Sequence, residues 1–109
     1  MVDGFWIVQY EGMKGNGGGV VMFIKGRVFG GDSGYTYIGS YRVQGNSVKA
    51  NVMVRNFLPD VPSVVGVVGD FELNIDAELD GDVIKGTGSL ANSQAVGIGL
   101  KLSRRAELP

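Results

Sequence analysis

The sequence has no cysteine and no histidine, and only 3 of its 109 residues are proline. The absence of cysteine excludes disulfides, thiolate nucleophiles and cysteine-ligated zinc or iron–sulfur centres. The absence of histidine removes the commonest general base and the commonest transition-metal ligand. We therefore expect a protein that is not an enzyme and that has no cofactor and no metal site.

The sequence also lacks an excess of either charge, since 10 basic and 11 acidic residues leave a formal net charge of −1. Binding to nucleic acid depends on a basic patch, so no nucleic-acid partner is expected. No stretch approaches the ~20 apolar residues of a membrane helix, and Asp3 stands where a secretory signal would be basic. The expected location is the cytoplasm, without membrane binding.

Glycine, by contrast, is abundant at 19 residues, and apolar and polar residues alternate along much of the chain. Residues 70–79 alternate without a break, which is typical of a half-buried strand with one solvated face. Residues 48–55 and 96–103 show the same period of two. Weaker strand patterns cover residues 4–11, 18–25, 27–31, 35–43 and 83–90.

Glycine-containing turn signals separate these strands, at residues 15–17, 25–27, 44–46 and 80–82. About eight short strands joined by tight turns predict an all-β fold, a meandering antiparallel up-and-down barrel formed by a single domain over residues 1–109. The connection over residues 56–69 differs, because it is long and mostly apolar. We expect it to fold across one end of the barrel, or to hold a short helical turn with an extra strand segment.

Trp6 near the start and Arg104 near the end are predicted to close this barrel. By parity Trp6 shares a face with Val8, and Arg104 continues the inward row of residues 96–103. The first and last strands of a closed meander are neighbours, so the guanidinium would cap the indole in a cation–π contact. The alternative is an ordinary core tryptophan and a frayed terminus. A Gly-x-Trp start with a late arginine resembles lipocalin-like, or calycin, barrels.

Some strands have apolar residues on both faces, although a barrel strand needs only one dry face. Phe5 and Ile7 point opposite to Trp6, and Val21 and Phe23 point opposite to the remaining apolar residues of their strand. These four residues are predicted to form a homodimer interface on the outside of the barrel. The alternative is that a loop such as 56–69 covers them.

Tyr35, Tyr37 and Tyr41 share one strand face and form an aromatic stripe with polar tips. Such a stripe suits a partner-binding surface or the lining of a cavity. The alternative is cross-strand packing, which stabilises any sheet. If the tyrosines face inward with Trp6, the barrel could enclose a small apolar ligand, as some eight-stranded barrels do.

Several segments in order resemble the GrlR family of negative regulators of type III secretion, which are small proteins with a calycin-like β-barrel. The resemblance covers roughly residues 3–79 and rests on Asp3-Gly4, Val20-Val21-Met22-Phe23-Ile24-Lys25-Gly26, Gly30-Gly31-Asp32, Tyr37-Ile38-Gly39-Ser40-Tyr41, Arg55, Pro62-Ser63-Val64 and Asp70-Phe71-Glu72-Leu73.

The resemblance implies a dimeric, non-enzymatic regulator that sequesters a transcriptional activator by protein contact. The family type carries an acidic surface cluster in the hairpin after the tyrosine-rich strand, whereas residues 43–47 here contain no acid. The resemblance therefore extends to the barrel but not to that contact. The alternative function is a carrier of a small apolar ligand, with an open barrel mouth and the 56–69 loop as its lid.

Overall fold

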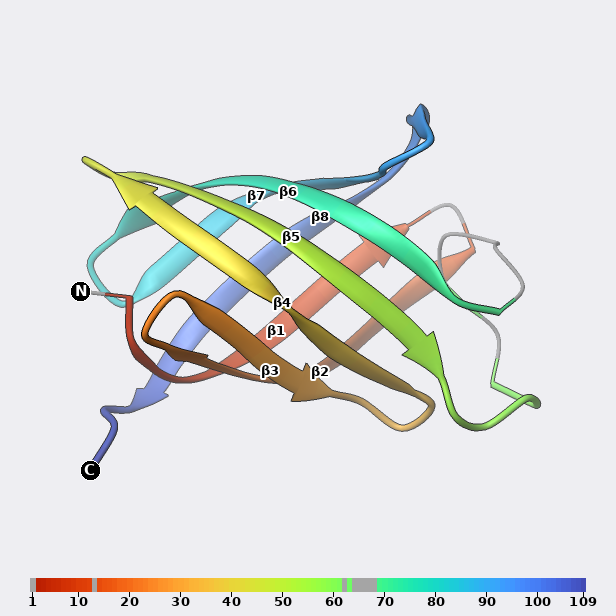
Figure 1. The fold of residues 1–109 in the computed structure, drawn as a ribbon, viewed down its shortest axis with the longest axis horizontal. Coiled ribbons are helices and arrows are strands. Elements are labelled where there is room, and N and C mark those ends of the chain that lie inside the picture. Colours follow the sequence, from red (N-terminus) through yellow and green to blue (C-terminus); the bar gives the residue numbers. More distant parts are fainter. Residues whose placement is uncertain (1, 13, 62, 64–68) are drawn as a thin grey trace.

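The computed structural model describes residues 2–12, 14–61, 63 and 69–109, with the backbone alone for residues 93–96. Within these residues eight strands form a closed antiparallel barrel, in which each strand pairs with the next and the last pairs with the first (Figure 1). The strands are β1 (Gly4–Gly12), β2 (Gly15–Ile24), β3 (Arg27–Gly31), β4 (Tyr35–Gln44), β5 (Ser47–Asn56), β6 (Phe71–Asp80), β7 (Val83–Leu90) and β8 (Ser93–Ala106). The predicted up-and-down barrel is confirmed.

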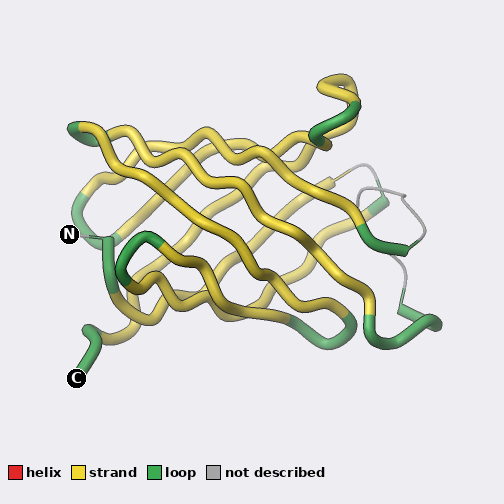
Figure 2. The backbone as a smooth tube through the Cα atoms, viewed as in Figure 1, coloured by secondary structure: helices red, strands yellow, loops and turns green. Residues whose placement is uncertain are grey.

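The described connections lie at the two ends of the barrel, between long strands (Figure 2). Lys25 and Gly26 join β2 to β3 with positive φ angles of 49° and 81°, the backbone that a two-residue hairpin turn requires. Gly45 and Gly81 serve the next two turns at the same end, each with φ 62°. Among the described residues there is no helix long and apolar enough to cross a membrane.

The turn predicted at residues 15–17 is wrong, because β2 already begins at Gly15, which lies opposite Gly12 of β1. Asn16 and Gly17 are paired strand residues opposite Glu11 and Tyr10. Glycine content alone suggested a turn here, whereas the pairing with β1 extends the strand through the glycine run. The chain therefore reverses before Gly15.

The connection between β5 and β6 closes one end of the barrel with Val61, which packs against the core, and Ser63, which is buried. Its described part contains a turn in which the Val61 amide donates to the Leu58 carbonyl at 3.0 Å, and no helix. The remainder of the predicted helical turn and extra strand segment falls on residues 62 and 64–68, outside the described residues.

The interior is lined by the inward side chains of all eight strands. In β6 the predicted alternation holds, since Leu73 and Ala77 are buried while Asn74, Asp76 and Glu78 are exposed. The buried apolar core comprises Val2, Trp6, Val8, Val21, Phe23, Val28, Tyr35, Tyr37, Val48, Val52, Val54, Leu73, Ala77, Ile84, Leu90, Ile98, Leu100 and Leu102.

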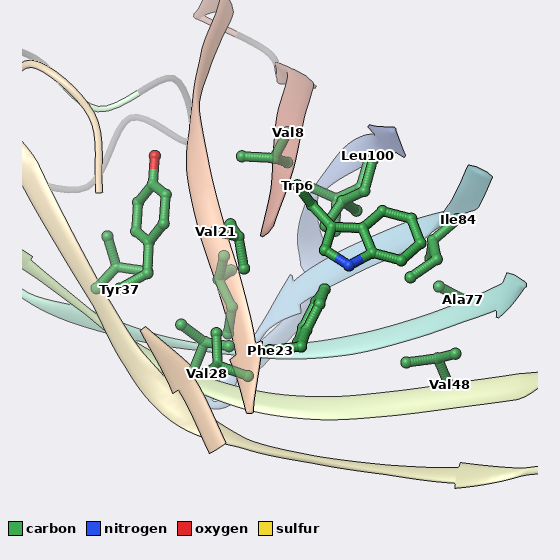
Figure 3. Packing of buried hydrophobic residues seen from close by; sticks show 14 of the residues in the cluster. Trp6, Val8, Val21, Phe23, Val28, Tyr37, Val48, Ala77, Ile84 and Leu100 are labelled. Carbon is green, nitrogen blue, oxygen red and sulfur yellow. The ribbon is translucent and has the colours of Figure 1, made fainter. Parts of the chain in front are cut away.

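Two of the four residues predicted for a homodimer interface belong to this core instead. Val21 and Phe23 are each only 5% exposed, and they point into the barrel beside Trp6 (Figure 3). The reason is register: Val21 lies directly opposite Trp6, and directly opposite residues of an antiparallel pair share a face. Phe5 and Ile7 keep the opposite parity and lie half-buried on the outside.

Trp6 and Arg104 meet where β1 pairs with β8. They lie opposite each other in the register, and the Arg104 guanidinium carbon sits 4.5 Å from the centroid of the indole ring. Arg104 also donates to the Asp3 carbonyl at 2.7 Å and to an Asp82 carboxylate oxygen at 2.9 Å. Trp6 donates to the Val2 carbonyl at 2.9 Å. Val2, Trp6 and Arg104 thus form the floor of the barrel.

We predict that Arg104→Met lowers the free energy of unfolding by about 1–3 kcal/mol, because it removes the cation–π contact and the charged hydrogen bonds of the floor while keeping an apolar chain. Urea denaturation measures the change. Arg105→Met is the matched control, because Arg105 is exposed. The register between β1 and β8 shifts at this point, so that Ala106 lies opposite Phe5 and Arg105 lies opposite no residue of β1. Equal losses in the two variants would contradict the assigned role of Arg104.

Candidate functional site

The three tyrosines predicted to bind a partner do not form an outer surface, so that prediction is corrected. All three belong to β4 and face the interior: Tyr35 and Tyr37 are at most 9% exposed, and Tyr41 packs against the core. Tyr37 lies opposite Val54 and Tyr35 opposite Asn56, positions that continue the buried row of β5. Tyr35 and Tyr37 correspond to the alternative of a cavity lining, whereas Tyr41 does not line the cavity.

The hydroxyls of these tyrosines go to opposite ends of the barrel. At the floor, Tyr41 donates to the carboxylate of Asp3, which also accepts the Lys25 amide at 3.2 Å. At the other end, Tyr35 donates to the Val61 carbonyl at 3.0 Å, and Tyr37 donates to Asp32. The tyrosines therefore tie loops to the barrel and do not converge on one point.

Tyr10, Asp32 and Tyr37 form a polar cluster, here called the Asp32 cluster, at the end away from the floor. Tyr10 and Tyr37 both donate to oxygen Oδ2 of Asp32, Tyr10 at 2.6 Å. Oxygen Oδ1 accepts the amides of Gly34 and Tyr35, each at 2.9 Å. This is the Asx-type turn that favours aspartate before a reversal of the chain.

The glycine run of β2 makes room for the Asp32 cluster. A Cβ atom on Gly17 would lie 2.9 Å from the ring of Tyr10, and one on Gly19 would lie 2.6 Å from the Gly31 carbonyl oxygen and 3.0 Å from the hydroxyl of Tyr37. Real Cβ atoms essentially never lie closer than 3.0 Å to such atoms. A side chain at Gly17 would therefore displace Tyr10, and one at Gly19 would push β2 away from the backbone of β3 and crowd Tyr37. The run is thus a strand whose missing side chains leave space for its neighbours.

Sequence analysis missed Tyr10 and Asp32 as site residues. The aspartate that precedes Ser33 and Gly34 is a local turn signal that could have indicated a fixed carboxylate. Its meeting with Tyr10 depends on the pairing of β1, β2 and β3, and no short motif encodes that pairing. Asp3 was missed as the partner of Tyr41 for the same reason.

Burial and the neighbouring carboxylates change the ionisation of the tyrosines. Desolvation, followed by the hydrogen bond to Asp32, raises the pKa of Tyr10 to about 12 and raises the pKa of Tyr37 further. Desolvation and the bond to Asp3 raise the pKa of Tyr41 to about 12. The Tyr41 hydroxyl, together with the Lys25 amide, holds the pKa of Asp3 below its usual value.

A cavity of about 130 Å³ lies inside the barrel between the floor and the Asp32 cluster. Aliphatic side chains from most strands form its wall, among them Val21, Leu73 and Leu100. Its polar lining comes from the Asp32 cluster with Ser33 and Ser63. In Figure 3 Tyr37 and Trp6 lie on opposite sides of the view, with Val21 and Phe23 between them. The cavity is thus apolar along its length and polar at one end.

The outside of the barrel carries a row of apolar residues across five strands, here called the outer row. Phe5 lies opposite Met22, Met22 opposite Phe29, Phe29 opposite Ile38, and Ile38 opposite Met53. Met22, Phe29 and Ile38 are 37%, 39% and 41% exposed. The outer row includes Phe5 of the predicted dimer interface, while its other members were not predicted.

The outer faces of the remaining strands are polar. In β6, β7 and β8 the exposed positions include Asp76, Glu78, Lys85 and Lys101, and Lys49 of β5 donates to Asp76 at 3.1 Å. The barrel thus has an apolar outer row across β1–β5 and a charged outer half over β6–β8, and exposed charged residues such as Arg42, Lys49 and Arg55 flank the row on β4 and β5. Among the described residues no three carboxylates are grouped so that they could hold a metal ion.

Fold and site together define a class: small, closed, up-and-down β-barrel proteins with an interior cavity and an apolar outer patch. The chain belongs to the GrlR family, since a family model described as T3SS negative regulator, GrlR, matches residues 1–96. The abbreviation denotes the type III secretion system, so the family supports a regulatory role for this chain. A comparison with curated proteins finds no match.

We predict that stability falls as pH rises from about 10 to 12. The unfolded state loses its tyrosine protons near pH 10.0, whereas folded Tyr10 and Tyr41 keep theirs until about pH 12, so the folded state holds more protons in this window. Urea denaturation on both sides of pH 10 measures the loss. Tyr10→Phe is expected to reduce its steepness, and an unchanged steepness would contradict the raised pKa of Tyr10.

Proposed function

We propose that this chain is a non-enzymatic regulator that acts by protein–protein contact and binds a transcriptional activator of type III secretion. The observation that carries this proposal is the outer row. A monomeric soluble protein rarely exposes a contiguous apolar patch unless the patch meets a partner. Membership of a family of negative regulators supports a regulatory role for such a contact.

The composition of the outer row suits a protein interface. Phenylalanine and methionine are enriched at interfaces, and charged residues are depleted from interface centres. The central Phe29 is flanked by Arg27, whose guanidinium carbon lies 5.6 Å from the centroid of the ring. An apolar centre with an arginine at its edge is the arrangement in which a few buried residues supply most of the binding energy.

The occupant of the outer row is, in this proposal, a second copy of the chain. The row carries no charge, so two copies related by a two-fold axis could face row to row without unpaired charges. If two copies met through the charged outer half instead, side chains such as Lys85 and Lys101 would each need an opposite charge on the other copy. The homodimer thus uses Phe5 as predicted, with Met22, Phe29 and Ile38 in place of Val21 and Phe23.

The activator contact differs from that of the family type. The β4–β5 turn is exposed at Val43, Gln44, Gly45 and Asn46, none of which is acidic. An acidic hairpin contact is therefore not available there. In the dimer the charged outer half stays exposed, and this half is the surface left for the activator.

We predict that the protein is a dimer in solution and that Ile38→Lys weakens the dimer at least tenfold, because it places a charge at the centre of an apolar interface. Sedimentation equilibrium measures the association. Thr87→Lys is the matched control, since Thr87 is exposed at mid-strand on the charged half, opposite Asp76. A monomeric parent protein, or a dimer unaffected by Ile38→Lys, would remove the outer row as the dimer interface.

We predict that expression of this chain lowers the transcription of type III secretion genes, and that Ile38→Lys reduces this repression while leaving the barrel folded. A transcriptional reporter measures the effect, with circular dichroism as the check on folding. Thr87→Lys tests whether the charged half takes part. The regulatory proposal fails if the parent protein leaves transcription unchanged.

A further inference from the structure

The size of the interior cavity limits what could occupy it. An engineered cavity of about 150 Å³ in another protein, lined by aliphatic and aromatic side chains, stays dry and takes up benzene. The cavity here, at about 130 Å³, is of the same order. It is smaller than the roughly 300–1,000 Å³ of pockets for drug-sized ligands. Its volume therefore suits a single ring or a short aliphatic chain and excludes a long-chain lipid.

The Asp32 cluster offers the cavity acceptors and not donors, while the hydroxyls of Ser33 and Ser63 lie at the same end. An ionised carboxylate has about four acceptor positions, and those of Asp32 are met by the hydroxyls of Tyr10 and Tyr37 and by the amides of Gly34 and Tyr35. Each phenol has one proton and donates it to Asp32. The lone pairs of the two phenolic oxygens can still accept, so a molecule in the cavity can bond to these two phenols only by donating.

The charge of the Asp32 cluster further limits which molecules could bind in the cavity. Among the described lining residues, Asp32 places a negative charge at the polar end of a mostly apolar space, so a carboxylate or another anion would be repelled. A neutral hydroxyl or amino group would meet the phenolic oxygens without bringing a charge into the interior. The aliphatic wall would cover the rest of the molecule.

We propose that the barrel interior is a binding site for a small neutral molecule, the size of one ring or a short aliphatic chain, whose single hydroxyl or amino group donates to the phenolic oxygens of Tyr10 and Tyr37. The site is independent of the regulatory proposal, because the outer row and the cavity lie on opposite faces of the same strands. Failure of either proposal leaves the other standing.

Phenol and toluene are the matched probes, since a hydroxyl in one replaces a methyl in the other at nearly the same size. Each is titrated into the full-length protein labelled with ¹³C at its methyl groups. Both are expected to bind and to shift the methyl signals of Val21, Leu73 and Leu100. Benzoate is the third probe, and it is expected to bind at least about tenfold more weakly than phenol because of the charge of Asp32.

The double variant Tyr10→Phe/Tyr37→Phe keeps the shape of the cavity and removes the acceptors. It is expected to change the ratio of the phenol and toluene affinities by about tenfold, because phenol then donates to oxygen Oδ2 of Asp32, which has lost both tyrosine donors. Tyr10→Phe alone, at a half-buried position, is the second variant if the double variant does not fold. Tyr41→Phe is the control, because Tyr41 lies at the floor and bonds to Asp3.

Filling the cavity tests its location. Ala50 lines the cavity, and Ala50→Leu is expected to abolish the binding of both probes. Ala77→Val is the milder alternative, since Ala77 also lines the cavity. The proposal is overturned if neither phenol nor toluene shifts these methyl signals, if the ratio of their affinities is unchanged in the Tyr→Phe variants, or if benzoate binds as tightly as phenol.

Discussion

The pairing of β1 with β8 is the interaction on which the whole barrel depends. An open eight-stranded meander would expose two strand edges with unpaired amides and carbonyls, and its apolar interior would be open to water. Arg104 ties this seam together, since it lies opposite Trp6, stacks on the indole and bonds to the Asp3 carbonyl, 101 residues away along the chain. Closure therefore requires nearly the complete chain, which makes it a late event in folding.

Each end of the closed barrel is held by tyrosine hydroxyls that donate to an aspartate. Asp3 receives Tyr41 at the floor, and Asp32 receives Tyr10 and Tyr37 at the other end. Buried phenols that find carboxylate partners satisfy their polar atoms while their rings fill the core. The same arrangement removes the tyrosines from the outer surface, where apolar residues such as Phe29 and Ile38 are exposed instead.

The fold could be predicted from the sequence wherever alternation was unambiguous, as in Phe71–Asp80, where only one face is apolar. In β2 both faces carry apolar residues, so the sequence does not show which face points into the barrel. The prediction for Val21 and Phe23 was therefore wrong. Their inward position follows from register, with Val21 opposite Trp6. The Asp32 cluster could not be predicted either, because its members come from separate strands and a turn that meet only when the barrel closes.

The glycine run of β2 has the composition of a flexible linker, yet its backbone packs closely against the neighbouring residues. A methyl group on Gly17 would collide with the ring of Tyr10, and one on Gly19 would collide with the Gly31 carbonyl oxygen of the neighbouring strand. The lack of a side chain is therefore as specific a requirement here as the presence of a carboxylate. In related sequences, the gain of a side chain at the position of Gly17 should accompany the loss of the Tyr10 ring, so that the two positions vary as a correlated pair.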